Sequence, residues 1–306
     1  MDEQLLLNHF YERLQRDVPL SRFTTSRVGG PARFYISANS ASQLAEDIRF
    51  LWDHEVPFFL LGSGANVLIG DAGLNAVVVH NQAKQITVSP NGERPTITAE
   101  SGTIFAAVAR QAAEYSLTGL EWASTVPGTV GGAVYGNAGA FGSTTKDNLI
   151  AAELLHRDKG YQLLSSEDMA YAYRSSALKR DPGKAVILTA RFGVEKGDKD
   201  RIQALMSEFG ERRRRTQPAG PSTGSTFKNP QGDFAGRLIE AAGLKGTRVG
   251  GVEVSQMHAN FFINDGTATA RDYYDLIQLV RDTVLEKFNV QLETEIEIIG
   301  DWQDAG

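Results

Sequence analysis

Residues 126–142 read VPGTVGGAVYGNAGAFG, a segment with six glycines and with alanines between them. Such small side chains cannot build a core by volume, and they leave the backbone open to a flat or phosphorylated ligand. A mobile loop is the alternative, but mobile loops are usually rich in Ser, Glu and Lys rather than in Ala and Val. The segment therefore favours a cradle for a ligand.

Another glycine-rich segment, which comes first in the chain, is Gly62-Ser63-Gly64-Ala65-Asn66-Val67-Leu68. It lies between apolar runs at residues 57–61 and 76–79 that are typical of strands. Residues 126–142 are thus the second glycine-rich segment in chain order. Successive main-chain N–H groups in such a turn can form a nest that binds an anion. A plain turn between two buried strands is the common alternative. The spacing is not that of a Rossmann site, because the third glycine and the following helix are missing. Two such segments in one chain favour the binding of a large cofactor.

The rest of the chain has the pattern of an α+β protein. We expect a first region over residues 1–195, with subdomains at about 1–85 and 86–195, and a second domain over 196–306 whose last strand could return to the first region. Helices are predicted at residues 4–16, 41–52, 104–115, 200–215, 233–242 and 269–288. Further strands are predicted at residues 97–99, 152–155, 160–164, 185–192, 252–254, 260–263 and 292–299.

Composition excludes several classes of protein. The 306 residues carry 31 Lys and Arg against 37 Asp and Glu, a net charge of −6, so the chain lacks the basic field that nucleic-acid binding needs. Because it has no cysteine, and its five histidines form no close ligand pair, thiolate catalysis is impossible and no metal site is expected. The N-terminus lacks the layout of a signal peptide, and no apolar stretch approaches the ~18 residues of a membrane span. We therefore expect a cytoplasmic protein without a membrane partner.

Two short segments carry side chains that could transfer a proton. The first, Gly224-Ser225-Thr226-Phe227-Lys228-Asn229-Pro230, sets a hydroxyl near a lysine in a glycine turn, although an ordinary helix-capping turn has the same local pattern. In the second, residues 292–299, the predicted strand places Glu293, Glu295 and Glu297 on one face. That face is either solvated or directs one carboxyl group into a cleft.

Basic side chains form two further candidates. Arg212-Arg213-Arg214-Arg215 at the end of a predicted helix either interacts with the helix dipole or clamps a diphosphate. Arg174, which follows Tyr173, is either a surface ion-pair residue or an anion ligand. His258 is more often a structural histidine than a catalyst in such a context.

Taken in order, these segments resemble the UDP-N-acetylenolpyruvoylglucosamine reductase family of flavoenzymes, which acts in peptidoglycan precursor synthesis. The resemblance runs from residues 25–32, Thr-Ser-Arg-Val-Gly-Gly-Pro-Ala, to Ile299-Gly300 and includes both glycine segments, residues 224–230, 250–264 and 293–300. It implies a two-part FAD-binding region of the vanillyl-alcohol-oxidase type, followed by a C-terminal α+β substrate domain. It also implies FAD as cofactor, NADPH as co-substrate and a UDP-sugar as substrate.

The resemblance also assigns roles to individual residues. It implies that Ser225 protonates the α-carbon of the enolpyruvyl group, that Arg174 stabilises the charge on the carboxylate, and that Glu295 lies beside it. Residues implied in substrate binding are Arg213, Lys228, Asn229 and His258. Residues implied in FAD binding are Gly62, Ser63, Gly64, Ala65, Asn66, Val67, Leu68, Pro127, Gly128, Gly131, Gly132, Asn137, Ala138 and Gly139.

One departure from the longer members of the family is visible. Residues 174–225 leave no room for the additional tyrosine-bearing loop that folds over the substrate, so the chain resembles the shorter subtype. The competing hypotheses are a flavin oxidoreductase of the same fold that acts on a small alcohol, and a non-catalytic protein that binds nucleotide sugars. A monomer is expected.

Overall fold

The structure is a computed structural model that describes residues 1–91, 94–300 and 302. Its chain falls into two compact units. The first comprises Met1–Glu3, Ile36–Ser63 and Val79–Arg213, and the second comprises Gln4–Tyr35, Gly64–Val78 and Arg214–Gly306. These units are defined by internal contacts, whereas the domains expected at 1–195 and 196–306 are defined by function, so the latter limits stay predictions.

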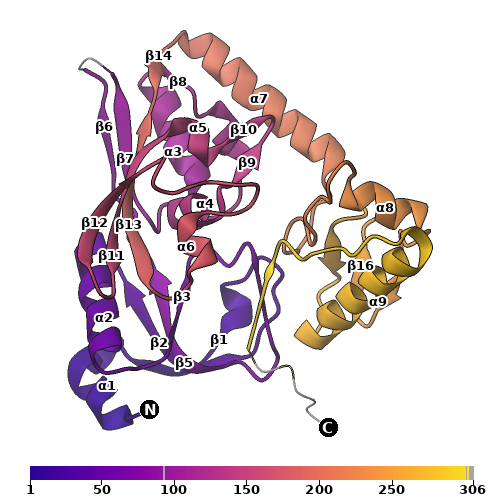
Figure 1. Ribbon diagram of the computed structural model, residues 1–306, viewed down its shortest axis with the longest axis horizontal. Helices are drawn as coiled ribbons and strands as arrows, with labels where there is room; N and C mark the ends of the chain where they lie inside the picture. Colours follow the sequence, from indigo (N-terminus) through magenta and orange to yellow (C-terminus); the bar gives the residue numbers. More distant parts are fainter. Residues whose placement is uncertain (92–93, 301, 303–306) are drawn as a thin grey trace. The chain divides into compact units, whose positions relative to one another are not determined.

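A helix is found at each predicted position, and further short helices occur where none was predicted. They are α1 (Glu3–Phe10), α2 (Ala41–Asp53), α3 (Phe105–Glu114), α4 (Val130–Gly136), α5 (Thr145–Asn148), α6 (Ala177–Arg180), α7 (Lys199–Thr216), α8 (Ala235–Ala241) and α9 (Ala270–Phe288), with 3-10 turns at Tyr11–Arg13, Leu20–Arg22 and Glu121–Thr125 (Figure 1). Ser40 caps α2 because its Oγ accepts a hydrogen bond from the N–H of Gln43 at 3.1 Å. The helix predicted over residues 4–16 is only half correct, because the chain enters a strand at Gln15.

The strands form several small sheets, and their bounds are β1 (Gln15–Pro19), β2 (Pro31–Ala38), β3 (Phe58–Leu61), β4 (Val67–Ile69), β5 (Leu74–Asn81), β6 (Ile86–Ser89), β7 (Thr96–Glu100), β8 (Leu117–Thr118), β9 (Gly139–Ala140), β10 (Ser143–Thr144), β11 (Leu149–His156), β12 (Gly160–Ser165), β13 (Ala185–Gly193), β14 (Glu195–Lys196), β15 (Arg248–Val249), β16 (Val252–Val254), β17 (Phe262–Asn264) and β18 (Glu297–Ile299). Strands β1, β2, β5 and β3 pair in that order.

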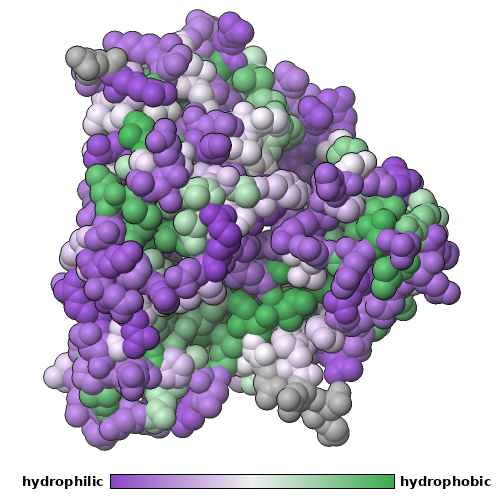
Figure 2. All heavy atoms as spheres, viewed as in Figure 1, coloured by the Kyte–Doolittle hydropathy of each residue, from purple (hydrophilic) through white to green (hydrophobic). Residues whose placement is uncertain are grey.

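The first unit contains an antiparallel sheet of strand order β12-β11-β13-β7-β6. Helices α3 and α4 lie against this sheet, and the core between them includes Phe105, Val130, Val134 and Phe192 (Figure 1). Strand β12 is an edge strand, and its Leu163 side chain is 66% exposed. Figure 2 shows apolar surface in the part of the view where β12 lies in Figure 1. The sheet therefore buries one face under α3 and α4.

The second glycine-rich segment is not a continuous loop, contrary to the expectation of an open backbone. Its middle forms α4, which begins after Thr129, whose side chain accepts from the N–H of Gly132. The helix ends at Asn137, which adopts the left-handed conformation with φ 49°. Phe141 and Gly142 then form the turn of the β9–β10 hairpin, both with positive φ. Caps at both ends offset the low helix propensity of glycine.

In the second unit α9 packs on the sheet β15-β16-β17, and α8 packs against α9. Its core includes Phe227, Leu238, Phe262 and Tyr273, all at most 1% exposed. Strand β18 pairs in parallel with β4, with Glu297 opposite Val67. Residues from the first quarter and from the end of the sequence are thus neighbours in one unit.

Candidate active site

The first glycine-rich segment links β3 to β4 and has a sharply turned backbone. Gly64 has φ +61°, and its carbonyl accepts hydrogen bonds from the N–H and the hydroxyl of Thr25, at 3.1 and 3.3 Å. The main-chain N–H groups of residues 62–66 donate to no other residue that the structure describes. Consecutive donors without an internal acceptor are what an anionic group such as a diphosphate requires. The segment therefore fits the phosphate part of FAD.

The second glycine-rich segment offers few such donors. The N–H groups of Val130 and Gly131 donate to the carbonyls of Thr103 and Ser101, each at 2.8 Å, and that of Ala133 donates to Thr129. A Cβ on Gly131 would lie 3.1 Å from Ser101, whereas one on Gly132 would be in ordinary contact. This segment fits a ligand by the absence of side chains rather than by free N–H groups.

Arg174 lies in a tight turn, and residues flanking this turn form hydrogen bonds with the C-terminal end of α4. Its φ is +54°, and the main chains of Ala172 and Ser175 exchange two hydrogen bonds around it. The last carbonyls of α4 are satisfied from this turn, because Tyr171 donates to Val134 and Ser176 donates to Tyr135 at 2.9 and 2.7 Å. The guanidinium lies 5.3 Å from the ring centroid of Tyr173. A strained backbone at a cationic side chain is typical of functional sites.

Asn137 connects the two features just described. Its Nδ2 donates to the carbonyl of Ala172 at 3.1 Å, and its Oδ1 accepts from the N–H of Lys146 at 3.1 Å. The side chain is therefore engaged with main chain on both sides. Asn137 was predicted to bind FAD, and these bonds give it in addition a structural link to the Arg174 turn.

Ser225 and Glu295 are brought together in the second unit. The segment 225–228 lies between two others, since Ser225 forms a bridge with Phe261, and Phe227 forms one with Thr294. The N–H of Glu295 donates to the carbonyl of Thr226 at 2.9 Å. Both Ser225 and Glu295 are half-buried. Ser225 and Glu295 therefore belong to adjacent, hydrogen-bonded segments of the second unit, whereas Arg174 and Arg213 belong to the first unit.

The expectation that three glutamates share one face of a strand is wrong. The strand comprises only Glu297–Ile299, and a bend at residues 295–296 interrupts the alternation. The cause is a change of partner, because residues 293–295 pair with 226–228 while β18 pairs with β4. Glu293 consequently points to solvent, 75% exposed, and forms an ion pair with Lys228 at 3.2 Å.

Asn66 joins the first glycine-rich segment to this bend. Its Nδ2 donates to the carbonyl of Glu295 at 3.1 Å, and its own carbonyl accepts from the N–H of Glu297 at 2.9 Å. These bonds lie within the second unit. A residue that was predicted only to bind FAD therefore also fixes the main chain of Glu295.

The remaining predicted substrate residues have mixed surroundings. Arg213 is half-buried, donates from Nη1 to the carbonyl of Thr125 at 2.6 Å, and has its pKa lowered by burial. The run at residues 212–215 is thus not a uniform charged face, since Arg212 lies over the ring of Phe141. Asn229 accepts from the N–H of Ala235 at the start of α8. Burial also lowers the pKa of His258.

Two other kinds of feature are absent among the residues that the structure describes. They contain no cluster of three or more His, Asp or Glu side chains that could hold a metal ion. None of their helices combines the length and the apolar character needed to cross a bilayer.

Similarity to known proteins covers nearly the whole chain. Residues 32–163 match a family model described as an FAD binding domain, and residues 216–299 match the C-terminal domain of UDP-N-acetylenolpyruvoylglucosamine reductase. The reductase of this name from Clostridium novyi is 41% identical over 292 residues, which are 95% of this chain and 93% of that protein. The one from Chloroflexus aggregans is 41% identical over 289 residues, 94% of this chain and 97% of that protein. A crystal structure of the reductase from Thermus caldophilus superposes with a TM-score of 0.80 at 33% identity, covering 94% of this chain and 99% of the other.

Proposed function

Because the chain belongs to the UDP-N-acetylenolpyruvoylglucosamine reductase family, we propose that it reduces the enolpyruvyl ether of UDP-N-acetylglucosamine to UDP-N-acetylmuramate, with NADPH as reductant and by way of FAD. The family confirms the predicted fold class, an FAD-binding region with a C-terminal α+β domain. It likewise identifies the chain as an FAD-containing oxidoreductase of peptidoglycan precursor synthesis.

The observation that carries the proposal is that Ser225 and Glu295 lie on adjacent segments, where the N–H of Glu295 donates to the carbonyl of Thr226, the residue next to Ser225. Bound FAD supplies the hydride chemistry. The protein must then protonate the α-carbon of the substrate, and the Oγ of Ser225 is the donor in our proposal. A hydroxyl can serve, because the carbanion-like carbon is far more basic than an alkoxide.

The other side chains stabilise charge in this proposal. Arg174 offsets the negative charge that develops on the substrate carboxylate, which a fixed cation does without reorganisation. Glu295 takes its place beside Ser225. In this proposal Arg213 contacts the diphosphate, Lys228 and Asn229 shape the Ser225 turn, and His258 belongs to the substrate-binding residues. In the proposal FAD is held by residues 62–68 and by residues 127–139. The first segment contributes main-chain N–H groups, and the second contributes backbone that no large side chain covers.

The visible spectrum of the purified protein tests the proposal. We expect a yellow protein that bleaches on anaerobic addition of NADPH and regains colour when the enolpyruvyl sugar is added. Ser225→Ala should still bleach with NADPH, while its recovery of colour slows by about 10²- to 10⁴-fold, the usual contribution of a general acid.

Ser222→Ala is the matched control. It removes another hydroxyl of the same turn, whose Oγ accepts from the N–H of Gly224 at 3.4 Å, and it should leave both phases unchanged. Full turnover in Ser225→Ala would refute the assignment of the acid. Rapid reoxidation by O2 without NADPH consumption would instead indicate an oxidase of small alcohols, and a colourless protein would indicate a nucleotide-sugar binder.

A further inference from the structure

Asn260 is a buried polar residue in an apolar surrounding, 3% exposed and just before β17. Its Oδ1 accepts from the N–H of Phe227 at 2.9 Å, and its Nδ2 donates to the carbonyl of the same residue at 2.8 Å. Its main-chain carbonyl accepts from the N–H of Thr226 at 2.9 Å. One residue thus satisfies three main-chain groups of the segment that follows Ser225.

This arrangement bears directly on the Ser225 hydroxyl. A serine Oγ is separated from the backbone by a single torsion with three staggered values, so a shift of the main chain moves the Oγ directly. The segment 225–228 is held by Asn260 and Phe261 on one side and by residues 293–295 on the other. On the first side the side chain of Asn260 bonds main-chain groups of the segment, so a substitution there can release the main chain without changing a residue of the segment itself. On the other side main-chain bonds and the ion pair of Lys228 with Glu293 hold the segment.

His258 supports Asn260 in turn. Its Nδ1 accepts from the N–H of Asn260 at 3.2 Å, and its ring packs edge-on against Phe261 with centroids 5.0 Å apart. An accepting Nδ1 requires the neutral imidazole. The lowered pKa of His258 agrees with that form.

We propose that Asn260 is a positioning residue, which acts through the main chain of Thr226 and Phe227 to hold the Ser225 hydroxyl in place for proton transfer. The inference rests on the proposed function, since it takes Ser225 as the proton donor. A purely structural role is the alternative, because a buried asparagine with satisfied hydrogen bonds also stabilises a fold.

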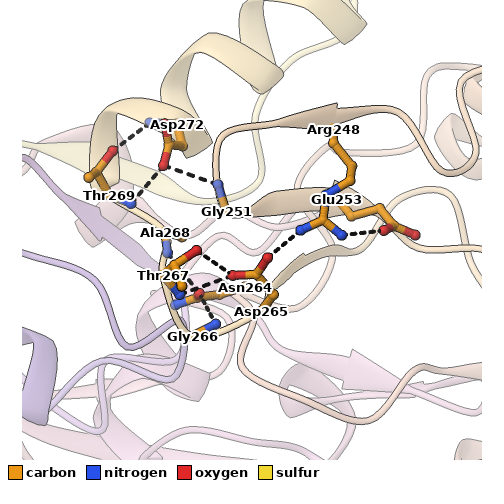
Figure 3. Close-up of polar contacts among 10 residues, drawn as sticks. All are labelled: Arg248, Gly251, Glu253, Asn264, Asp265, Gly266, Thr267, Ala268, Thr269 and Asp272. Atoms are coloured by element: carbon orange, nitrogen blue, oxygen red, sulfur yellow. Dashed lines mark hydrogen bonds and ion pairs between the residues drawn. The ribbon is translucent and has the colours of Figure 1, made fainter.

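Asn264 provides a matched control. It is 4% exposed, lies in the same unit, and its amide also binds main chain: Nδ2 donates to Ser26, and Oδ1 accepts from Gly266 and Ala268. Figure 3 shows this amide in the turn between β17 and α9, facing Gly266 and Ala268. It makes no hydrogen bond to the segment 225–228 among the described residues.

The experiment compares Asn260→Ala with Asn264→Ala in the FAD-loaded protein. In Asn260→Ala we expect NADPH to reduce FAD at a rate within about twofold of the native protein, while transfer to the enolpyruvyl sugar at saturation slows by about 10²-fold, as for a displaced catalytic group. The main-chain amides of residues 224–230 should also exchange hydrogen faster in Asn260→Ala than in the native protein, and this difference should persist when both proteins are free of flavin. Asn264→Ala should lower the melting temperature yet change neither the transfer rate nor this exchange.

Asn260→Asp keeps the inference testable if the alanine variant does not fold. A protonated carboxyl group has one acceptor and one donor, as the amide has, whereas the carboxylate only accepts. We therefore expect the transfer rate of Asn260→Asp to recover as the pH falls, relative to the native enzyme at each pH. A rate ratio independent of pH would overturn the inference, as would equal losses in Asn260→Ala and Asn264→Ala.

The failure of this inference is distinct from failure of the proposed function. If Ser225→Ala transfers normally, the proton donor is wrongly assigned. If Ser225→Ala is slow but Asn260→Ala is fast, only the positioning role is wrong. The double variant Ser225→Ala with Asn260→Ala should be no slower than Ser225→Ala alone, because positioning has no effect once the hydroxyl is absent.

Discussion

The two glycine-rich segments have similar composition but differ in the hydrogen bonding of their main-chain N–H groups. In residues 62–66 the main-chain N–H groups donate to no described residue, whereas in residues 130–133 those of Val130, Gly131 and Ala133 are paired with nearby carbonyls. The first segment is thus a set of donors, and the second is a capped helix without bulky side chains. Glycine content alone does not make an anion-binding nest; the available N–H groups do.

The steric demands on the glycines differ in the same way. A Cβ on Gly64 would lie 2.1 Å from the carbonyl oxygen of Phe23, and the residue also needs a positive φ. On Gly136 a Cβ would meet nothing within 4 Å. The fold therefore requires glycine at position 64, while at position 136 only a ligand could require it.

The largest effect is expected from Gly64→Ala, which combines a left-handed backbone with a clash against main chain. We expect it to lower the free energy of unfolding by about 3 kcal/mol, measured by guanidinium denaturation of the flavin-free protein. Gly136→Ala is the control and should not destabilise. Equal stability of the two variants would remove the steric distinction between the segments.

An intermediate effect is expected at Asn137, where the second segment meets the Arg174 turn. Asn137→Ala loses the bonds to Ala172 and Lys146 and strains a left-handed position, so we expect a loss of about 2–3 kcal/mol in the free energy of unfolding. Asn137→Gly loses only the side-chain bonds and should recover about 1 kcal/mol of that loss. Thermal denaturation of the two variants separates the contribution of the side-chain bonds from that of the backbone conformation. Equal stability of the two variants would show that the left-handed backbone conformation contributes nothing.

The smallest effect on stability is expected from Gly132→Ala. This variant tests most directly whether the second glycine-rich segment needs small side chains for a ligand rather than for the fold. The new Cβ lies 3.7 Å from the Thr129 hydroxyl, and alanine in a helix is favoured over glycine by about 0.5–1 kcal/mol. The flavin-free protein should therefore be slightly more stable, while its affinity for FAD falls because the methyl group occupies open backbone. Fluorescence titration with FAD measures this, and unchanged affinity would exclude close approach of the cofactor to Gly132.

Much of the fold could be predicted from the sequence because its signals are local. Thr269 and Asp272 form a capping box at the start of α9, and Ser40 caps α2. The start of each helix can therefore be predicted from a few neighbouring residues. Helix α4 was not foreseen, because it depends on the carbonyls of Ser101 and Thr103, nearly thirty residues earlier in the chain.

The candidate site was predictable in its residue types and not in its connections. Ser225, Glu295 and Arg174 were identified from motifs and from resemblance to a family. The role of Asn260 was missed, although one signal was present, since a lone asparagine interrupts the apolar run Ala259-Asn260-Phe261-Phe262. A buried amide of this kind must find partners, but the sequence does not say which.

By itself, the sequence determined the longer helices, many of the strands and the two glycine-rich segments, because periodicity, caps and glycine content act over a few residues. Only the tertiary structure decided which N–H groups lack an internal acceptor, where the strand after Glu295 begins, and what holds Ser225. Those outcomes depend on hydrogen bonds between distant residues, such as Asn66 with Glu295, 229 positions apart, and Asn260 with Phe227, 33 apart. A hydrogen bond needs both partners in place, and folding alone brings them together.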